Sequence, residues 1–187
     1  MSLSFSVRVN RAILRALVLT LFLTGFSQMT MAKSLQQAVA VDYLQGEGDV
    51  QGLKLAYQHH VDWLHGLDPR LNMLFEASAN VWRYGPANSS DSNAVLAVSP
   101  VLRYPLGQAF DSNWDLEFGI GVSLLDDTRF AGKDVSTHYQ FEDRLGLVAW
   151  LAPDRSLTIR YLHYSNAGFK RPNPGLDFVS LSYGWYF

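Results

Sequence analysis

The feature of this sequence that most constrains its fold is an alternation of apolar and polar residues in segments of about ten residues. In WDLEFGIGVSL, residues 114–124, every second residue from Trp114 to Leu124 is large and apolar. The residues between them are small or charged: Asp115, Glu117, Gly119, Gly121 and Ser123. Because successive side chains of a strand point to opposite faces, this pattern predicts a β-strand with one apolar and one polar face.

Segments of this kind recur along the chain, separated by stretches rich in Gly, Pro, Asn and Asp. Eight are expected, at residues 36–44, 50–61, 70–83, 94–105, 113–124, 137–150, 156–166 and 177–187. They have 9 to 14 residues, which is long for a soluble sheet and suited to crossing a bilayer at a tilt. An even number of antiparallel strands can close without a free edge. The sequence therefore predicts an all-β fold, an eight-stranded antiparallel transmembrane β-barrel.

The polar faces of these segments contain charges of both signs: Lys54, Glu76, Arg103, Glu117, Glu142, Arg144 and Arg160. The interior of an eight-stranded barrel is just wide enough to be filled by side chains. We therefore expect these groups to pair inside the barrel as a structural polar core rather than to line a channel. A soluble lipid-binding barrel would need an apolar interior and a polar exterior, and the charges on the interior face argue against it.

Residues 1–32 are expected to be a signal peptide. Arg8, Arg11 and Arg15 precede an apolar run of eleven residues at 16–26, and Ala32 ends a plausible cleavage site. The run is short for a membrane-spanning helix, which needs about 20 apolar residues. We therefore predict a signal peptide at 1–32 and an outer-membrane barrel at 33–187.

Composition excludes some partners. Without residues 1–32, 12 basic and 17 acidic residues remain, a net charge of −5 with neutral histidines. Nucleic acid is not expected as a partner, because phosphate binding needs a basic face. The sequence has no cysteine, so disulfides do not hold the fold. Trp, Tyr and Phe together number 25 of 187 residues, and an outer-membrane barrel displays such residues in belts at the membrane interfaces.

The final segment, DFVSLSYGWYF, places Val179, Leu181, Tyr183, Trp185 and Phe187 on one face. A last strand that ends in Phe resembles the signature read by the outer-membrane insertion machinery. This favours the cell outer membrane of a Gram-negative bacterium as the location, over a buried C-terminal strand in a soluble sheet. With both termini on the periplasmic side, the segments 84–93, 125–136 and 166–176 would be extracellular, and the turns at 106–113 and 151–155 periplasmic.

A candidate site lies in the segment RSLTIRYLHYSNAG. Alternation places His163 and Ser165 on the lipid-facing side, and the following strand places Asp177 on the same face. If the 166–176 loop is symmetric, His163 lies directly across from Asp177, and the short turn at 151–155 places Phe141 across from Ser165. Both registers are hypotheses, because a slip of one residue would reverse every side chain.

Serine, histidine and carboxylate on one surface are the groups of acyl transfer. His163 would take the proton from Ser165, and Asp177 would hold the imidazole in the right tautomer. N–H groups of Asn166 and Gly168 could stabilise an oxyanion. Each of these residues also has an ordinary structural interpretation, as a strand end or a turn. A histidine and a carboxylate on a lipid face are nevertheless costly, which favours a functional role.

The stretch HYSNAGFKRPNPG, residues 163–175, closely resembles the signature of the PagL family of outer-membrane lipid A 3-O-deacylases. Two further stretches are similar, FGIGVSLLDDTRFAG at 118–132 and FEDRLG at 141–146. The resemblance covers the C-terminal half well, and the N-terminal half in strand pattern and length. It implies an eight-stranded barrel with a Ser-His-Glu triad on its outer surface.

Applied residue by residue, the resemblance implies that Ser165 is the nucleophile, His163 the general base and Asp177 the triad acid. The family often has Glu at the acid position, and Asp is one methylene shorter. Three further positions match family residues near the site: Asn166 and Gly168 at the oxyanion, and Phe141 as an aromatic close to the substrate.

The resemblance implies hydrolysis of the ester-linked 3-hydroxyacyl chain at position 3 of lipid A. Lipopolysaccharide and the surrounding outer-membrane lipids are then the expected partners. Lys170 and Arg171 could attract the phosphates of lipid A or be solvated loop charges. No cofactor or metal is implied, since the remaining histidines show no metal-ligand spacing: His59, His60, His65 and His138.

Two other functions are compatible with the sequence. An outer-membrane phospholipase or acyltransferase could use the same triad on another lipid. A non-catalytic structural barrel would tolerate alanine at all three triad positions. The sequence does not decide the preferred acyl length, whether activity is latent in the native membrane, or whether the barrel forms a homodimer.

Overall fold

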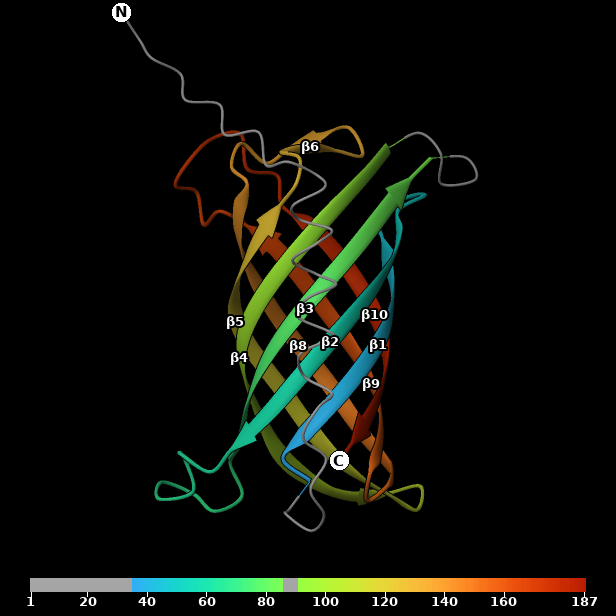
Figure 1. The fold of residues 1–187 in the computed structure, drawn as a ribbon, viewed down its shortest axis with the longest axis vertical. Helices are drawn as coiled ribbons and strands as arrows, with labels where there is room; N and C mark the ends of the chain where they lie inside the picture. The colour runs from blue at the N-terminus through green and yellow to red at the C-terminus, as the bar shows by residue number, and fades with distance from the viewer. Residues whose placement is uncertain (1–34, 86–90) are drawn as a thin grey trace, which may run out of the picture. The chain divides into compact units, whose positions relative to one another are not determined.

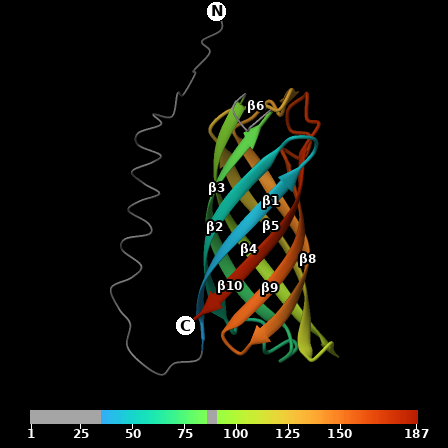
Figure 2. The ribbon, with the colours of Figure 1, turned by 90° about the vertical axis from the view of Figure 1, so that its right-hand side faces the viewer.

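The structure is a computed structural model that describes residues 35–85 and 91–187. Within these ranges, eight long strands form one closed antiparallel barrel, in the order β1-β10-β9-β8-β5-β4-β3-β2 (Figures 1 and 2). They are β1 Gln37–Gly46, β2 Gln51–Val61, β3 Asn72–Tyr84, β4 Asp91–Ala109, β5 Ser112–Leu125, β8 Tyr139–Ala152, β9 Arg155–Ser165 and β10 Leu176–Tyr186. The predicted eight-stranded barrel is confirmed. The predicted signal peptide at 1–32 lies outside the described residues.

Each long strand pairs with its neighbours in the chain, and β10 closes the barrel against β1. The strand ends lie within a few residues of those predicted, except for β4, which extends from Asp91 to Ala109 with a register shift between Pro105 and Gly107. Pro100 is compatible with its place in β4 because it points outward and has no partner in the β4–β5 register. In the described part of the chain, no helix is long and apolar enough to span a membrane.

Two short strands were not predicted. β6 Arg129–Phe130 and β7 Lys133–Asp134 pair as a small hairpin inside the segment expected to be a loop. The hairpin lies at the barrel end that also holds the 166–175 loop, opposite the C-terminus (Figure 1). We call this the site end, formed by residues 46–51, 125–139 and 165–176. Strands of two residues have no periodicity, so alternation could not indicate them.

The barrel interior is a layer of paired charges, as predicted. Among the described residues, four cationic and four anionic side chains form this layer: Lys54, Arg103, Arg144, Arg160, Asp42, Glu76, Glu117 and Glu142. A fifth buried carboxylate, Asp115, accepts a hydrogen bond from Trp150 Nε1 instead. The pairs of the layer include Lys54–Glu76 at 2.8 Å, Arg103–Glu117 at 2.8 Å, Arg144–Glu76 at 2.9 Å and Arg160–Asp42 at 2.8 Å. The layer is electrically balanced, which is what allows charges to be buried at all.

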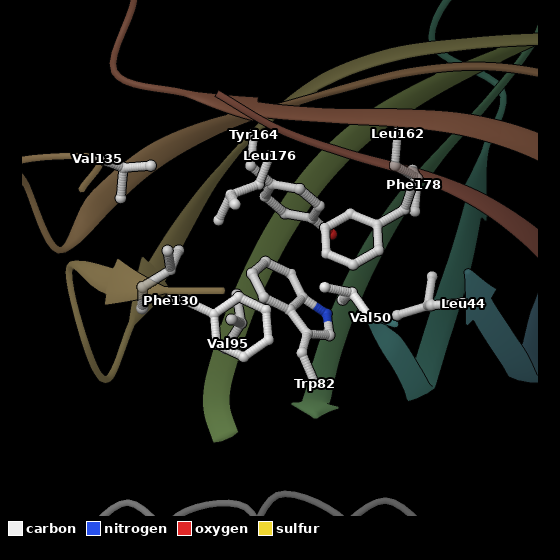
Figure 3. Close-up of a cluster of buried hydrophobic side chains, with 11 residues drawn as sticks. Leu44, Val50, Trp82, Val95, Phe130, Val135, Leu162, Tyr164, Leu176 and Phe178 are labelled. Atoms are coloured by element: carbon white, nitrogen blue, oxygen red, sulfur yellow. The ribbon is translucent and has the colours of Figure 1, made fainter. Parts of the chain in front are cut away.

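An aromatic cluster fills the barrel interior above this layer, toward the site end (Figure 3). The Trp82 ring lies 4.6 Å from Phe178 and 4.8 Å from Tyr164, and Phe130 of the hairpin packs against it at 6.0 Å. The Tyr164 hydroxyl donates to Glu142 at 2.8 Å and so joins the two layers. The filled interior fits a structural core rather than a channel.

The outer surface of the barrel is apolar along the strands. Large side chains point outward and are 40–60% exposed: Val41, Leu53, Leu55, Phe118, Ile120, Val122, Leu145, Ile159, Val179 and Leu181. A soluble protein rarely exposes so large an apolar surface. This belt is the surface that lipid covers in an outer-membrane barrel.

Candidate active site

Strand register brings the predicted triad residues to one place on the lipid-facing surface. In the β9–β10 ladder, His163 lies opposite Asp177, and in the β8–β9 ladder Ser165 lies opposite Phe141. Both predicted registers are confirmed. The buried side chains of Leu162 and Tyr164 alternate with the two candidates, which fixes their outward direction.

His163 and Asp177 are joined by a short hydrogen bond. The ring nitrogen Nδ1 lies 2.6 Å from Asp177 Oδ1. A carboxylate oxygen can only accept, so in the neutral imidazole Nδ1 holds the proton and Nε2 has the lone pair. The two side chains are 33% and 27% exposed, at the edge of the barrel wall. The pair therefore presents a basic nitrogen on the outer surface.

A second donor reaches the same carboxylate. The Tyr161 hydroxyl donates to Asp177 Oδ1 at 2.5 Å. Tyr161 was not predicted to take part in the site. The available signal was its position two residues before His163, which places the two side chains in one outward row.

Ser165 is half-buried at the end of β9, two residues after His163. Such residues lie about 7 Å apart along a strand, within reach of inclined side chains. Among the hydrogen bonds of the described residues, none joins the Ser165 hydroxyl to the His163 ring. Catalytic hydrogen bonds are often long in an enzyme without substrate and tighten when substrate binds.

Gly175 fixes the ring of His163 from another side. A Cβ added at Gly175 would lie 2.6 Å from His163 Cε1 and 3.4 Å from both ring nitrogens. Gly175 also has a φ of +70°, which favours glycine. The backbone therefore approaches the imidazole as closely as it does because this residue has no side chain.

Asn166 fastens the loop that follows the serine. Its Oδ1 accepts from the Gly168 N–H at 3.0 Å, and its Nδ2 donates to the carbonyls of Val135 and Lys170, each at 3.0 Å. Its own N–H donates to Asn173 Oδ1 at 3.2 Å. The donors predicted for an oxyanion at Asn166 and Gly168 are thus engaged by the loop itself and by Val135 of the hairpin segment.

The loop begins with a tight turn. The Phe169 N–H donates to the Asn166 carbonyl at 3.0 Å, and Ala167 and Gly168 have φ values of 52° and 78°. Two consecutive positive φ angles are typical of a type I′ turn. Within the described residues, the Ala167 N–H has no acceptor, so it is the donor of this turn that is open to a ligand.

The β6–β7 hairpin supports the same loop. Lys133 Nζ lies 2.6 Å from Glu47 Oε2 and donates to the Gly175 carbonyl at 3.2 Å. The Ser136 hydroxyl donates to the Pro172 carbonyl at 2.6 Å. The backbone at Gly175, which contacts His163, is therefore held by a hairpin more than 40 residues earlier in the chain.

A cavity of about 970 Å³ lies between the hairpin and the loop. Its lining combines cationic, amide and backbone groups: Gly132, Lys133, Asp134, Gly168, Arg171, Pro172, Asn173 and Pro174. The pKa of Asp134 is lowered by a hydrogen bond from the Ser136 N–H and by Arg129. The side chains of Lys170 and Arg171, in the loop that borders this cavity, are both exposed.

Aromatic side chains flank the nucleophile candidate. Phe141, directly opposite Ser165, lies 6.3 Å from Phe169 between ring centroids, and Phe169 is 73% exposed. The two rings form an apolar wall next to the hydroxyl. In residues 35–85 and 91–187, no group of three or more possible metal ligands gathers at this or any other place.

Comparisons with known proteins agree with this geometry. The model of the PagL family, described as lipid A 3-O-deacylase, matches residues 51–186. The lipid A deacylase PagL of Bordetella bronchiseptica is 35% identical over 160 residues, which cover 83% of this chain and 86% of that protein. The lipid A deacylase PagL of Pseudomonas aeruginosa is 31% identical over 153 residues, with coverage of 81% and 86%.

A comparison with solved structures also finds PagL. The crystal structure of the outer membrane enzyme PagL superimposes with a TM-score of 0.65 and 26% sequence identity. The match covers 80% of this chain and 99% of that chain. Sequence and fold therefore point to the same family over most of the barrel.

Proposed function

Because this chain belongs to the PagL family of lipid A 3-O-deacylases, we propose that it is an outer-membrane ester hydrolase that removes the acyl chain at position 3 of lipid A. The observation that supports this most strongly is the His163–Asp177 hydrogen bond, on the lipid-facing surface and two residues from Ser165. Ionisable groups in contact with lipid are unfavourable, so they are retained where function needs them.

The proposed reaction is an acyl transfer to serine followed by hydrolysis. Ser165 Oγ attacks the ester carbonyl carbon while His163 Nε2 accepts the hydroxyl proton. The tetrahedral intermediate then releases the sugar hydroxyl, which takes that proton from the imidazolium. Water attacks the resulting acyl-serine and gives its proton to Nε2. The fatty acid leaves as Ser165 regains its hydrogen.

Asp177 stabilises the imidazolium in both steps, because its carboxylate faces the Nδ1–H at 2.6 Å. Its expected role is the same as that of a glutamate, with a shorter side chain brought close by direct cross-strand pairing. A carboxylate that remained distant would leave the charged ring unsupported next to lipid.

The tight turn after Ser165 is the proposed place of oxyanion stabilisation. Asn166 and Gly168 remain the predicted residues, and their hydrogen bonds to each other support a role in shaping the turn. The Ala167 N–H between them is open and stands two residues from the nucleophile. Backbone donors held in advance of the reaction stabilise developing charge without reorganisation.

The substrate would reach this site from the side, within the membrane. The apolar belt continues up to His163 and Ser165, so an acyl chain can lie along the barrel wall with its ester at the site. Phe141 and Phe169 would contact the chain next to the ester. The phosphorylated sugar would then face the site end, where Lys170 and Arg171 are exposed.

Purified protein tests this proposal directly. Lipid A in mixed detergent micelles is incubated with the parent and with Ser165→Ala, and the released 3-hydroxy fatty acid is quantified. We expect Ser165→Ala to lower the rate by about 10³-fold or more, since triad serines contribute at least this much. Ser180→Ala, a strand serine that faces the interior, serves as the control. Release by Ser165→Ala at the parent rate, or no release by folded parent, would contradict the proposal.

A further inference from the structure

Tyr161 makes a contact that a lipid-facing tyrosine does not need. In the β9–β10 ladder Tyr161 lies opposite Val179, and Asp177 is the next outward residue toward the site end. This diagonal distance is within reach of a long side chain. The hydroxyl crosses it and donates to Asp177 Oδ1 at 2.5 Å. His163 Nδ1 is 2.6 Å from that same oxygen.

Two donors on one oxygen define how the carboxylate is oriented. The side chain of Asp177 turns about two bonds, and a single hydrogen bond from His163 would leave it free to swing around that contact. Among the described residues, His163 and Tyr161 are the donors that reach this carboxylate. Lys133 lies nearby, but its ammonium is engaged with Glu47 and with the Gly175 carbonyl.

We propose that Tyr161 is a positioning residue of this active site, whose hydroxyl holds the Asp177 carboxylate toward His163 Nδ1 and shares its negative charge. The inference rests on the proposed function, because a fixed carboxylate matters only if His163 acts as a base. At the membrane edge water is scarce, and a hydroxyl supplied by the neighbouring strand replaces the solvent hydrogen bond that a carboxylate would otherwise have.

Other tyrosines of the barrel surface show what an ordinary aromatic of the belt does. Tyr43, Tyr139 and Tyr183 are 44–45% exposed, close to the 50% of Tyr161. The Tyr43 hydroxyl donates to Gln45, a neutral side chain. No hydrogen bond of the Tyr183 hydroxyl occurs among the described residues, although Tyr183 is on β10, the strand of Asp177. Tyr183→Phe is therefore a matched control for Tyr161→Phe.

The test uses the full-length protein and lipid A in mixed micelles, with kcat, KM and the pH profile measured for both variants. We expect Tyr161→Phe to lower kcat about tenfold, the effect of losing one hydrogen bond to a charged group, with KM within about twofold of the parent. Tyr183→Phe should match the parent in all three. A tyrosine that only contacts lipid would give the two variants the same result.

The pH profile separates positioning from packing. Without the Tyr161 hydroxyl, the full charge of Asp177 Oδ1 faces the ring and favours the imidazolium. The acid limb of kcat/KM is therefore expected to move to higher pH. Asp143, which lies opposite His163 in the β8–β9 ladder, is present in the parent and the variant alike, so it does not account for the difference. A loss of lipid packing alone would lower the rate at every pH without moving this limb.

A double-variant cycle completes the test. In an Asp177→Ala background, Tyr161→Phe should have no further effect on the residual rate, because no carboxylate is left to hold. Independent, multiplying effects would overturn the inference, as would a Tyr161→Phe variant with the parent kcat and pH profile. If Tyr161→Phe fails to give the folded, heat-modifiable barrel, Tyr161→Leu is measured with the same expectations. An inactive parent would instead refute the proposed function.

Discussion

The imidazole of His163 is held by contacts from several elements. Asp177 Oδ1 accepts from Nδ1, and the backbone of Gly175 lies against the ring so closely that a Cβ there would be 2.6 Å from Cε1. The hydrogen bond to Asp177 does not engage Nε2, the nitrogen that the proposed reaction uses. The ring is thus fixed in orientation while its basic atom stays available.

Replacement of Gly175 by alanine should displace this ring. The new Cβ would overlap Cε1, so the imidazole must move away from the orientation set by Asp177. We expect kcat to fall about 100-fold, because misplacement of a catalytic group by about 1 Å has effects of this size. The measurement is the release of fatty acid from lipid A by the purified variant.

Gly132→Ala is the control for backbone strain. Gly132 has a φ of +76°, similar to that of Gly175, but a Cβ there meets nothing within 4 Å. It should keep most of the parent rate. Equal losses in the two variants would mean that strain, and not contact with His163, explains the effect.

At the scale of elements, the loop from 166 to 175 depends on a hairpin distant in the sequence. Asn166 is fully buried and donates to Val135 and Lys170, while Ser136 and Lys133 of the hairpin segment bond to the loop backbone. The turn that follows the nucleophile is therefore as rigid as its attachment to this hairpin.

Asn166→Asp should release the loop. The two residues have the same size, but a carboxylate cannot donate to the Val135 and Lys170 carbonyls and would be buried against them. Each buried acceptor left unpaired costs about 1–3 kcal/mol. We expect trypsin to cleave after Lys170 at least about tenfold faster than in the parent, together with loss of deacylation. Asn113→Asp, an exposed change at the far end, should leave cleavage unchanged. A resistant and active Asn166→Asp would contradict this account of the loop.

The strand pairing around the site could be predicted from the sequence, but the hairpin and two of the contacts to the triad could not. The alternation in β8, β9 and β10, together with loop symmetry, was enough to pair His163 with Asp177 and Ser165 with Phe141. The β6–β7 hairpin was missed because two-residue strands have no pattern. Tyr161 and Gly175 were missed because their roles depend on side-chain reach and on close approach of backbone to ring, which sequence spacing does not encode.

At the scale of the whole barrel, charge pairing and aromatic packing share the interior. Arg160 donates to both Glu117 and Asp42, and so connects β9 with β5 and β1. The charges were predicted from alternation to lie inside and to pair. Which ones pair was beyond prediction, since partners such as Arg160 and Asp42 are 118 residues apart and meet only when the barrel closes.

Arg160→Met should destabilise the barrel. Asp42 would be left buried without a cation, while Glu117 keeps Arg103. Removing one partner of a buried pair costs about 3–5 kcal/mol. Urea unfolding of the liposome-reconstituted protein, followed by tryptophan fluorescence, measures this free energy.

The double change Asp42→Leu with Arg160→Met should recover much of the loss, because it removes the unpaired charge. If the single variant were as stable as the parent, the polar layer would not be a structural core.

The most direct test of the central claim is to locate the acyl chain that the protein removes. The parent and Ser165→Ala are expressed in the outer membrane of a Gram-negative host, and tandem mass spectrometry is applied to the extracted lipid A. The account predicts loss of one 3-hydroxyacyl chain, from position 3, with the parent and none with Ser165→Ala. Intact lipid A with a folded parent, loss from another position, or loss that persists in Ser165→Ala would contradict it.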